Sequence, residues 1–321
     1  MKAVVYDKYG SFENLELRDI DEPSVGDDAV RVRVRSAGLH AGDCLAVRGS
    51  PFVVRFATGL FRPKHGIPGF DIAGQVEAVG KDVTRYQVGD EVFGACEGAC
   101  AELVCVKERS LAPKPTKLSF EQAAALPTSA LAALHALRDV AKVDAGQKVL
   151  INGASGGVGT FAVQIAKFFG AEVTGVCSAA NIEMLRSIGA DDVIDYNQED
   201  FASGEQHYDL IFDNVENRSL SDLRAALTRK GMLILNSGTG AQGMKMFIRL
   251  IKPLLLSPFV SQDLRRYLSV PNDEDLVVLK QLVDSGKLTP VIDETFPLDQ
   301  AATALAYIER GHARGKVVLR V

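Results

Sequence analysis

The first third of the chain alternates apolar and polar residues in short runs, a pattern typical of strands that bury one face. Residues 29–38 read AVRVRVRSAG, with valine and arginine exchanging at every second position, which predicts a half-buried strand. The runs GFDIAGQVEAVG, from residue 69, and VGDEVFGACEGACAELVCV, from residue 88, continue the pattern of short strands separated by turns. We therefore expect a compact β-barrel-like domain, in which RSAGLHAGD, residues 35–43, is a short polar turn.

At about residue 119 the pattern changes to an alanine- and leucine-rich helical stretch, SFEQAAALPTSALAALHALRDV. Ser119 is the expected N-cap of this stretch, with Gln122 three residues later. From residue 148, strands alternate with helices; the strands are KVLINGAS, AEVTGVCS, DDVIDY, YDLIFDNV and MLILNSG, and the helices are VGTFAVQIAKFFG, NIEMLRSIG and LSDLRAALTRKG. This alternation predicts a doubly wound parallel sheet and an α/β fold class. The last run, GKVVLRV, is expected to rejoin the first domain.

Composition limits the classes of partner. The 321 residues are enough for two domains, and the formal net charge of -5 gives no basic face of the kind that nucleic acid requires. The N-terminal MKAVVYDKYG lacks the apolar core of a secretory signal, so we expect a cytoplasmic protein. Its five cysteines are an odd number in a long chain, which predicts free thiols in a reducing compartment.

A glycine-rich turn follows the strand that ends at Asn152. In INGASGGVGTFAVQIAK, residues 151–167, Gly156 and Gly159 lie between this strand and an amphipathic helix. Glycines let the backbone approach a pyrophosphate, the helix N-terminus points free N–H groups at it, and Gly159 permits close packing of helix and strand. The alternative is an incidental glycine-rich turn, which the flanking strand and helix disfavour.

The end of the next strand indicates which nucleotide is bound. Residues 176–183 read VCSAANIE, with no acid before Glu183, whereas an NAD site usually has an acid there to hold the ribose 2′-hydroxyl. Ser178 and Asn181 can donate hydrogen bonds to a 2′-phosphate, and Tyr196 ends the following strand. The sequence therefore favours NADPH over NADH. Alternatively, Ser178 and Asn181 only cap the following helix.

Taken together, these features resemble the medium-chain dehydrogenase/reductase superfamily. GASGGVGTFAVQIAK, GVCS with its following asparagine, GADDVIDY and GHARGKVV are similar to its zinc-independent quinone oxidoreductase branch. The resemblance covers essentially the whole chain. It implies a GroES-like β-barrel catalytic domain, residues 1–122 completed by 290–321, and a Rossmann doubly wound parallel-sheet domain, residues 123–289, with the active site in the cleft between them.

The resemblance also implies positions for the cofactor. The pyrophosphate would lie against Ser155, Gly156, Gly157 and Val158. The adenosine phosphate end would contact Ser178, Asn181 and Tyr196, and the middle and nicotinamide side would contact Asn214 and Gly238. Thr128 matches a residue placed near the nicotinamide in relatives. Close relatives often carry a basic residue where this chain has Ala179 and Ala180.

Zinc is not expected. Alcohol dehydrogenases of the superfamily bind catalytic zinc through a cysteine in the turn that here holds His40, a Gly-His-Glu run and a later cysteine. This chain has Phe70 and Asp71 in that run, and LPTSALAAL lacks the later cysteine. The FGACEGACAELVCV stretch has three cysteines, spaced C-x3-C-x4-C, which does not match two C-x2-C pairs of a structural site. A local pair of His40 and Cys44, four residues apart, is the remaining metal alternative.

Without zinc, the accessible chemistry is the reduction of an electron-poor acceptor, a quinone or an alkene conjugated to a carbonyl. His40 is the candidate to polarise the acceptor carbonyl or to hold the nicotinamide amide; the alternative is a turn histidine with no chemical role. Asp43 is expected to hydrogen-bond backbone within its turn rather than to react.

Two apolar stretches bear on the substrate. SPFVVRFATGLFRPKHG, residues 50–66, either roofs the pocket or is simple packing. KMFIRLIKPLLLSPFV, residues 245–260, is an amphipathic helix by its spacing and could be a lid, a subunit contact or a membrane-surface helix. Pro253 shortens it and favours a lid or subunit contact, so membrane contact is not expected. An apolar lid suits a small hydrophobic acceptor.

The sequence as a whole predicts an NADPH-dependent, zinc-independent reductase of quinones or α,β-unsaturated carbonyls. Two alternatives stay open: a zinc-type alcohol dehydrogenase, and a low-turnover NADPH-binding sensor or structural protein. The intact phosphate-loop glycines do not separate a catalyst from a binder. The resemblance alone implies a homodimer.

Overall fold

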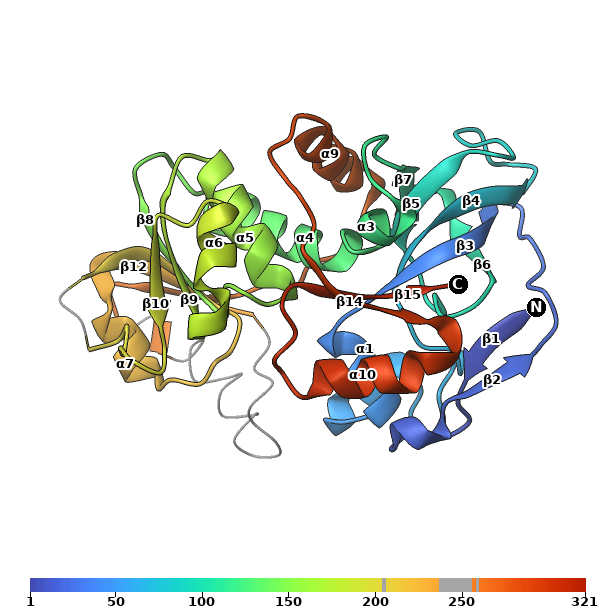
Figure 1. Ribbon diagram of the computed structural model, residues 1–321, viewed down its shortest axis with the longest axis horizontal. Helices are drawn as coiled ribbons and strands as arrows, with labels where there is room; N and C mark the ends of the chain where they lie inside the picture. Colours follow the sequence, from blue (N-terminus) through green and yellow to red (C-terminus); the bar gives the residue numbers. More distant parts are fainter. Residues whose placement is uncertain (204–205, 237–255, 258–259) are drawn as a thin grey trace. The chain divides into compact units, whose positions relative to one another are not determined.

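The computed structural model describes residues 1–203, 206–236, 256–257 and 260–321 (Figure 1). Gly238 and most of the 245–260 stretch lie outside the described residues. The chain forms two compact units, one of residues 1–131 with 270–321 and the other of residues 132–269. Across the described ranges, no helix is both long enough and apolar enough to cross a lipid bilayer.

The first unit is built on a seven-stranded sheet. Its strands run in the order β14-β15-β3-β4-β5-β7, and β6 also pairs with β3. Their bounds are β3 (Ala29–Leu39), β4 (Asp71–Val79), β5 (Glu91–Ala95), β6 (Leu103–Lys107), β7 (Leu111–Pro113), β14 (Ile292–Pro297) and β15 (Lys316–Arg320), and a separate pair consists of β1 (Lys2–Val5) and β2 (Glu16–Asp19). The alternation in β3 works as predicted, because Val30, Val32 and Val34 are buried.

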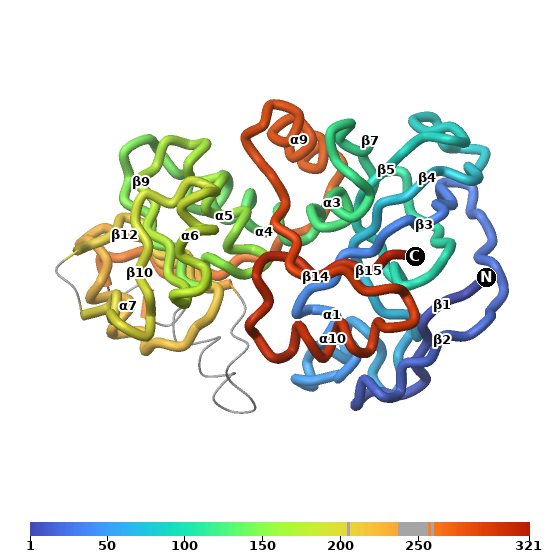
Figure 2. Tube along the Cα trace, viewed as in Figure 1, coloured from blue at the N-terminus to red at the C-terminus, as the bar shows by residue number. Residues whose placement is uncertain are grey.

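The C-terminal strand completes this sheet. β15 pairs with β3 in antiparallel register, Val317 opposite Leu39 and Arg320 opposite Ser36, and β14 pairs with β15 in parallel. Figure 2 shows the red end of the chain beside the blue trace of β3. The expectation that GKVVLRV returns to the first domain is therefore confirmed.

The expectation of a turn at residues 35–43 is wrong. Strand β3 continues to Leu39, helix α1 (Ala41–Arg48) begins two residues later, and only His40 lies between them. β4 and β15 flank the end of β3, so Ser36, Ala37 and Leu39 are all buried and the polar alternation is lost. At Gly38 a Cβ atom would lie 2.1 Å from the carbonyl oxygen of Ala124, so this glycine serves close packing rather than a turn.

The first unit also contains short helices. Besides α1, they are α2 (Arg55–Thr58), α3 (Phe120–Ala124), α9 (Asp273–Asp284) and α10 (Ala301–Glu309), and α4 (Pro127–Leu134) begins in this unit and ends in the second. α3 packs on β3 and β4, and α10 packs on α1 and β15. Ser119 Oγ caps α3 by accepting from the backbone N–H of Gln122, and Oε1 of Gln122 accepts from the backbone N–H of Ser119, as predicted. The 3-10 turns of the first unit are Phe12–Asn14, Phe52–Val54, Glu108–Ser110 and Leu298–Gln300. The second unit has the 3-10 turn Ala179–Asn181 and the π-helical turn His135–Val140.

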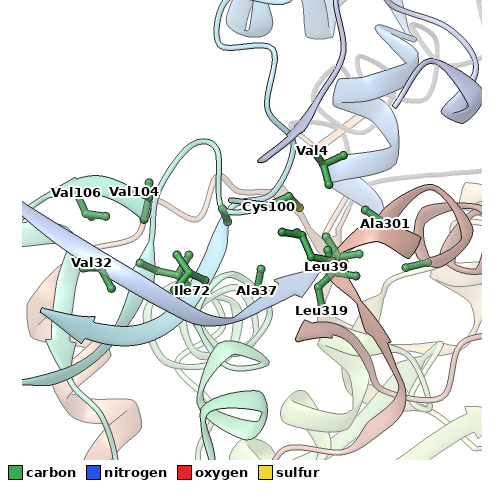
Figure 3. Close-up of a cluster of buried hydrophobic side chains, with 14 of the residues drawn as sticks. Val4, Val32, Ala37, Leu39, Ile72, Cys100, Val104, Val106, Ala301 and Leu319 are labelled. Carbon is green, nitrogen blue, oxygen red and sulfur yellow. The ribbon is translucent and has the colours of Figure 1, made fainter. Parts of the chain in front are cut away.

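The core of the first unit combines residues from both ends of its sequence. Figure 3 shows Val32 and Leu39 of β3 with Ile72 of β4 and Leu319 of β15. All four side chains are essentially inaccessible to solvent. Burying an aliphatic side chain of this size contributes about 1.5–3 kcal/mol, so the last strand is part of what stabilises the first.

The second unit contains a six-stranded parallel sheet in the order β10-β9-β8-β11-β12-β13. This is the Rossmann strand order, with the reversal between β8 and β11. The strands are β8 (Lys148–Asn152), β9 (Glu172–Cys177), β10 (Asp192–Asp195), β11 (Tyr208–Asp213), β12 (Leu227–Leu235) and β13 (Asp263–Arg266), and the helices are α5 (Gly157–Phe168), α6 (Ile182–Ser187) and α7 (Leu220–Ala225). α5 packs on β8 and β9, α6 on β10 and α7 on β12.

One helix is shorter than its sequence pattern suggests. LSDLRAALTRKG was expected to be helical to its glycine, but α7 ends at Ala225 and β12 begins at Leu227. Leu227 is buried and pairs with Tyr208 of β11, so its side chain joins the sheet core rather than continuing the helix.

A buried ion pair joins three elements of the first unit. Nζ of Lys316, the first residue of β15, lies 3.4 Å from Oδ2 of Asp71 in β4 and donates to Oγ of Ser129 in α4 at 3.1 Å. Lys316 is 1% exposed and Asp71 is fully buried. A charge buried this completely requires its partner, because removing one member leaves the other unsolvated.

Replacing Lys316 with methionine is therefore expected to lower the free energy of unfolding by about 3–5 kcal/mol, because the Asp71 carboxylate loses its cation. Urea denaturation measures this change. The double variant Asp71→Asn/Lys316→Met serves as control and should recover part of the loss, since the buried carboxylate is gone. A loss of less than about 1 kcal/mol in the single variant would contradict a paired charge at this position.

Candidate functional site

The phosphate loop lies between β8 and α5. Gly153 has φ of +74°, a left-handed conformation that favours glycine. Gly156 is the N-cap of α5, and no side chain caps this helix. The first-turn N–H groups of α5 are therefore not satisfied by a side chain, which is the arrangement that binds phosphate at helix N-termini.

Two glycines of the loop have different roles. A Cβ at Gly159 would lie 2.2 Å from the oxygen of Gly153 and 2.7 Å from Cα of Ala154, so the close packing predicted for Gly159 is confirmed. A Cβ at Gly156 would meet only the oxygen of Gly153, at 3.4 Å. Its φ of -82° is accessible to any residue. The backbone at Gly156 is thus open to the approach of another group, among the residues that the structure describes.

The ends of β9 and β10 bring together the residues expected at the adenosine end. Asn181 Nδ2 donates to Oγ of Ser178 at 3.2 Å, and the backbone N–H of Tyr196 donates to the oxygen of Cys177 at 3.1 Å. Ser178 and Asn181 stand at the N-cap positions of the 3-10 turn Ala179–Asn181 and of α6, but neither side chain forms a capping hydrogen bond. Their role at a 2′-phosphate stays a prediction. Tyr196 is 45% exposed, and no carboxylate ends β9.

The carboxyl ends of β8 and β11 carry a polar network that the sequence interpretation missed. Asp213 is fully buried, and its Oδ1 accepts hydrogen bonds from Asn152 Nδ2 at 2.8 Å and from the N–H groups of Val215 and Glu216 at 3.1 and 2.9 Å. The sequence feature that could have identified Asp213 is an acidic residue directly after the apolar run LIF. Asp213 therefore fixes the backbone at the sheet edge where a Rossmann fold binds its ligand.

Asn214 belongs to the same edge. Its Nδ2 donates to the oxygen of Asn152 at 3.2 Å, and its Oδ1 accepts from Asn236 Nδ2 at 2.8 Å. Its side chain thus links the ends of three neighbouring strands. A role in holding the middle of the cofactor remains a prediction.

His40 is the N-cap of α1 in the first unit. Its Nδ1 accepts the backbone N–H of Gly42 at 3.0 Å, and its own N–H donates to Oδ2 of Asp43 at 2.7 Å. Because a peptide N–H can only donate, Nδ1 carries a lone pair and the neutral ring holds its proton on Nε2. Nε2 is buried and has no hydrogen-bond partner among the described residues. His40 therefore presents an unused N–H donor.

Asp43 has the structural role that was expected of it. Its side chain is fully buried and accepts the His40 N–H in a reciprocal capping arrangement. Burial raises the pKa of the Asp43 carboxyl, and the neighbouring charge of Asp71 adds to the rise. The prediction that Asp43 hydrogen-bonds backbone is confirmed.

Thr128 is oriented by the same buried carboxylate that pairs with Lys316. Its backbone N–H and its hydroxyl both donate to Oδ1 of Asp71, at 3.0 and 2.5 Å. Since the hydroxyl proton is committed to Asp71, Oγ1 of Thr128 can only accept a further hydrogen bond. Asp71 thus determines what kind of ligand group Thr128 can hold.

The donors around His40 do not fit a zinc ion. The ring of Phe70 stacks on His40, with 5.5 Å between ring centroids and 15° between planes, and Asp71 is already held by Thr128 and Lys316. Cys44 donates to the oxygen of Leu305 at 3.4 Å, and burial raises its pKa to about 12. In the part of the chain that the structure describes, no three His, Cys, Asp or Glu side chains are grouped to hold a metal. All five cysteines are free thiols, as predicted.

Comparisons with known proteins agree with this geometry. Residues 26–116 match the alcohol dehydrogenase GroES-like domain, and residues 188–319 match the zinc-binding dehydrogenase family. The 2-methylene-furan-3-one reductase of Solanum lycopersicum is 32% identical, over 99% of this chain and 79% of its own. The NADPH-dependent alkenal/one oxidoreductase of Arabidopsis thaliana, a chloroplastic protein, is also 32% identical, over 99% and 79%.

Among solved structures, the quinone oxidoreductase from Coxiella burnetii has a TM-score of 0.85 and 32% sequence identity, and the match covers 100% of this chain and 99% of that one. The whole-length similarity, the Rossmann strand order and a donor set unsuited to zinc point to the same group. The chain therefore belongs to the medium-chain dehydrogenase/reductase superfamily, in its zinc-independent quinone oxidoreductase-like branch.

Proposed function

We propose that this protein transfers a hydride from NADPH to a quinone or to an α,β-unsaturated carbonyl compound. The observation that carries the proposal is the buried Nε2–H of His40, which has no hydrogen-bond partner among the described residues and lies in a cluster whose side chains do not fit zinc. Such a cluster can polarise a carbonyl oxygen but lacks the Lewis acid that alcohol oxidation uses in this superfamily. The names of the relatives, a 2-methylene-furan-3-one reductase, an alkenal/one oxidoreductase and a quinone oxidoreductase, support the same acceptor class.

The cofactor would be held by the second unit. The open helix end at Gly156, with Ser155, Gly157 and Val158, suits the pyrophosphate. Ser178, Asn181 and Tyr196 suit a 2′-phosphate, because their side chains are polar and carry no negative charge to repel it. NADPH supplies the hydride when it is bound. Gly238 stays a prediction for the nicotinamide side.

The first unit would supply orientation and polarisation. The Nε2–H of His40 would donate to the acceptor carbonyl, whose oxygen gains negative charge as the hydride arrives. Oγ1 of Thr128, an obligate acceptor, is suited to an amide N–H group such as that of the nicotinamide. Stacking on Phe70 and capping of α1 hold the His40 ring in place, so the donor would not need to reorient during the reaction.

The purified protein is expected to oxidise NADPH when 1,4-quinones or enones are added, and not to reduce NADP⁺ with simple alcohols. NADPH absorbance follows the reaction, and parallel assays with NADH give the ratio of kcat/KM values. Tight NADPH binding without acceptor-dependent oxidation would indicate a binding protein instead of an enzyme. A preference for NADH of about tenfold or more, about 1.4 kcal/mol, would overturn the nucleotide assignment.

The two loop glycines offer a matched pair of substitutions. Gly156→Ala should leave the free energy of unfolding within about 0.5 kcal/mol of wild type and weaken NADPH binding about tenfold or more, because the new methyl group enters the space assigned to the pyrophosphate. Gly159→Ala should lower the free energy of unfolding by about 1–3 kcal/mol, because its Cβ meets backbone. Urea denaturation and calorimetric titration with NADPH measure both. Wild-type NADPH affinity in Gly156→Ala would place the pyrophosphate elsewhere.

His40 can be tested separately as cap and as donor. Asparagine is a good N-cap but lacks the Nε2–H, so His40→Asn should keep the stability near wild type and lower kcat/KM for the acceptor about 100-fold. His40→Ala loses the cap as well and should also cost about 1 kcal/mol of stability. Steady-state kinetics and thermal unfolding provide the two readouts. Unchanged turnover in His40→Asn would reduce this histidine to a helix cap.

A further inference from the structure

A loop of the first unit, residues 51–64, exposes an unusual concentration of large apolar side chains. Phe52, Val53, Phe56 and Phe61 are 59%, 57%, 73% and 86% exposed, and Leu60 is 39% exposed. These five are nearly half of the twelve large apolar side chains found exposed in the described part of the chain, and they fall within ten residues. Single exposed apolar side chains are ordinary, but a contiguous group marks an interaction surface. We call residues 51–64 the aromatic loop.

Polar contacts fasten the aromatic loop to the domain. The Tyr9 hydroxyl bonds with Oγ1 of Thr58 at 2.9 Å and donates to the oxygen of Gly59 at 2.6 Å. Nε of Arg55 donates to the oxygen of Gly49 at 2.9 Å, and its guanidinium lies 4.7 Å from the centre of the Tyr9 ring. Thr58, Gly59 and Arg55 thus face the domain while the phenylalanines are exposed. Their exposure is a property of the folded loop.

The chain segment that contains the aromatic loop carries no acidic residue of its own. No Asp or Glu occurs between Asp43 and Asp71, although the chain carries a net charge of -5. Arg62 and Lys64 are exposed, and neither forms an ion pair within the described ranges. The aromatic loop therefore combines exposed phenylalanines with unpaired cations.

We propose that the aromatic loop docks this protein reversibly on the surface of an anionic lipid bilayer. Phenylalanine and leucine side chains enter the boundary between headgroups and acyl chains, and neighbouring Lys and Arg side chains are attracted to anionic headgroups. Tyr9 and Arg55 hold the loop through hydrogen bonds, and its outer side carries exposed apolar side chains together with the exposed cations of Arg62 and Lys64. A lipid surface needs no directional partner for such a set, whereas a protein partner typically adds a rim of hydrogen bonds. The docking does not depend on the proposed reaction.

Vesicle co-sedimentation of the full chain tests the proposal. The lipid is phosphatidylcholine alone, or phosphatidylcholine and phosphatidylserine in equal parts, at low and high salt. We expect about tenfold or tighter binding to the phosphatidylserine vesicles at low salt, and loss of this advantage at high salt. Equal or absent binding to both lipids would overturn the proposal.

Two variants and one matched control locate the surface. Phe56→Ser/Phe61→Ser should weaken binding to phosphatidylserine vesicles about tenfold or more, and Arg62→Glu/Lys64→Glu should abolish the preference for anionic lipid. Leu268→Ser is the control, because Leu268 is 85% exposed, like Phe61, but lies outside the loop. All three side-chain sets are exposed, and circular dichroism checks that each variant is folded.

Two outcomes would contradict this assignment. Wild-type lipid binding in Phe56→Ser/Phe61→Ser would show that another surface is responsible. If the same variant instead abolished a concentration-dependent self-association measured without lipid by analytical ultracentrifugation, and lipid binding were absent in the wild type, the loop would be an interface between two copies of the chain.

Discussion

One buried ion pair fixes the first unit of this protein. Asp71 is inaccessible to water, and its carboxylate is compensated by the Lys316 ammonium and by two hydrogen bonds from Thr128. Asp71 belongs to the central strand β4, Lys316 to the last strand β15 and Thr128 to helix α4. Because a buried charge without its partner is strongly destabilising, the pair favours the pairing of β15 with β3, and the Asp71 carboxylate orients the Thr128 hydroxyl.

The two nitrogens of the His40 ring have different surroundings. Nδ1 caps α1 and thereby assigns the proton of the neutral ring to Nε2. In zinc-dependent members of the superfamily the corresponding position binds metal, and Lewis acidity does the polarising. In this chain Phe70 stacks against the ring. The Nε2–H of His40 is a hydrogen-bond donor at the position where zinc-dependent members have a metal ligand. A hydrogen-bond donor polarises a carbonyl less strongly than a metal ion does. It therefore suits the proposed reduction of acceptors that are already electron-poor.

Local patterns predicted much of the second unit. β8, the glycine loop and α5 follow from an apolar run, a glycine cluster and a 3.6-residue period, each of which lies within a few residues. The same reasoning failed at residues 35–43, because both edges of β3 are covered at that point and a fully buried strand loses its alternation. It also extended α7 too far, since nothing local shows that Leu227 pairs with Tyr208.

The site was harder to predict than the fold. Gly156 and Gly159 followed from the spacing of the glycine-rich turn, but Ser155, Val158 and Thr128 were placed only by resemblance, and the network around Asp213 was missed. Asp71 and Lys316 are 245 residues apart, and no local pattern connects them. Their partnership exists only once the sheet is assembled, so it could not be derived from periodicity or from turn chemistry.

The place of β15 has a consequence for the order of folding during synthesis. Residues 132–269 are contiguous and carry all six strands of their sheet, so this unit can fold as soon as it has left the ribosome. The first unit cannot close its sheet at that stage: β3 lacks one neighbour and the Asp71 carboxylate lacks its cation until residue 316 emerges. The part of the protein that is made first is therefore the part that is finished last.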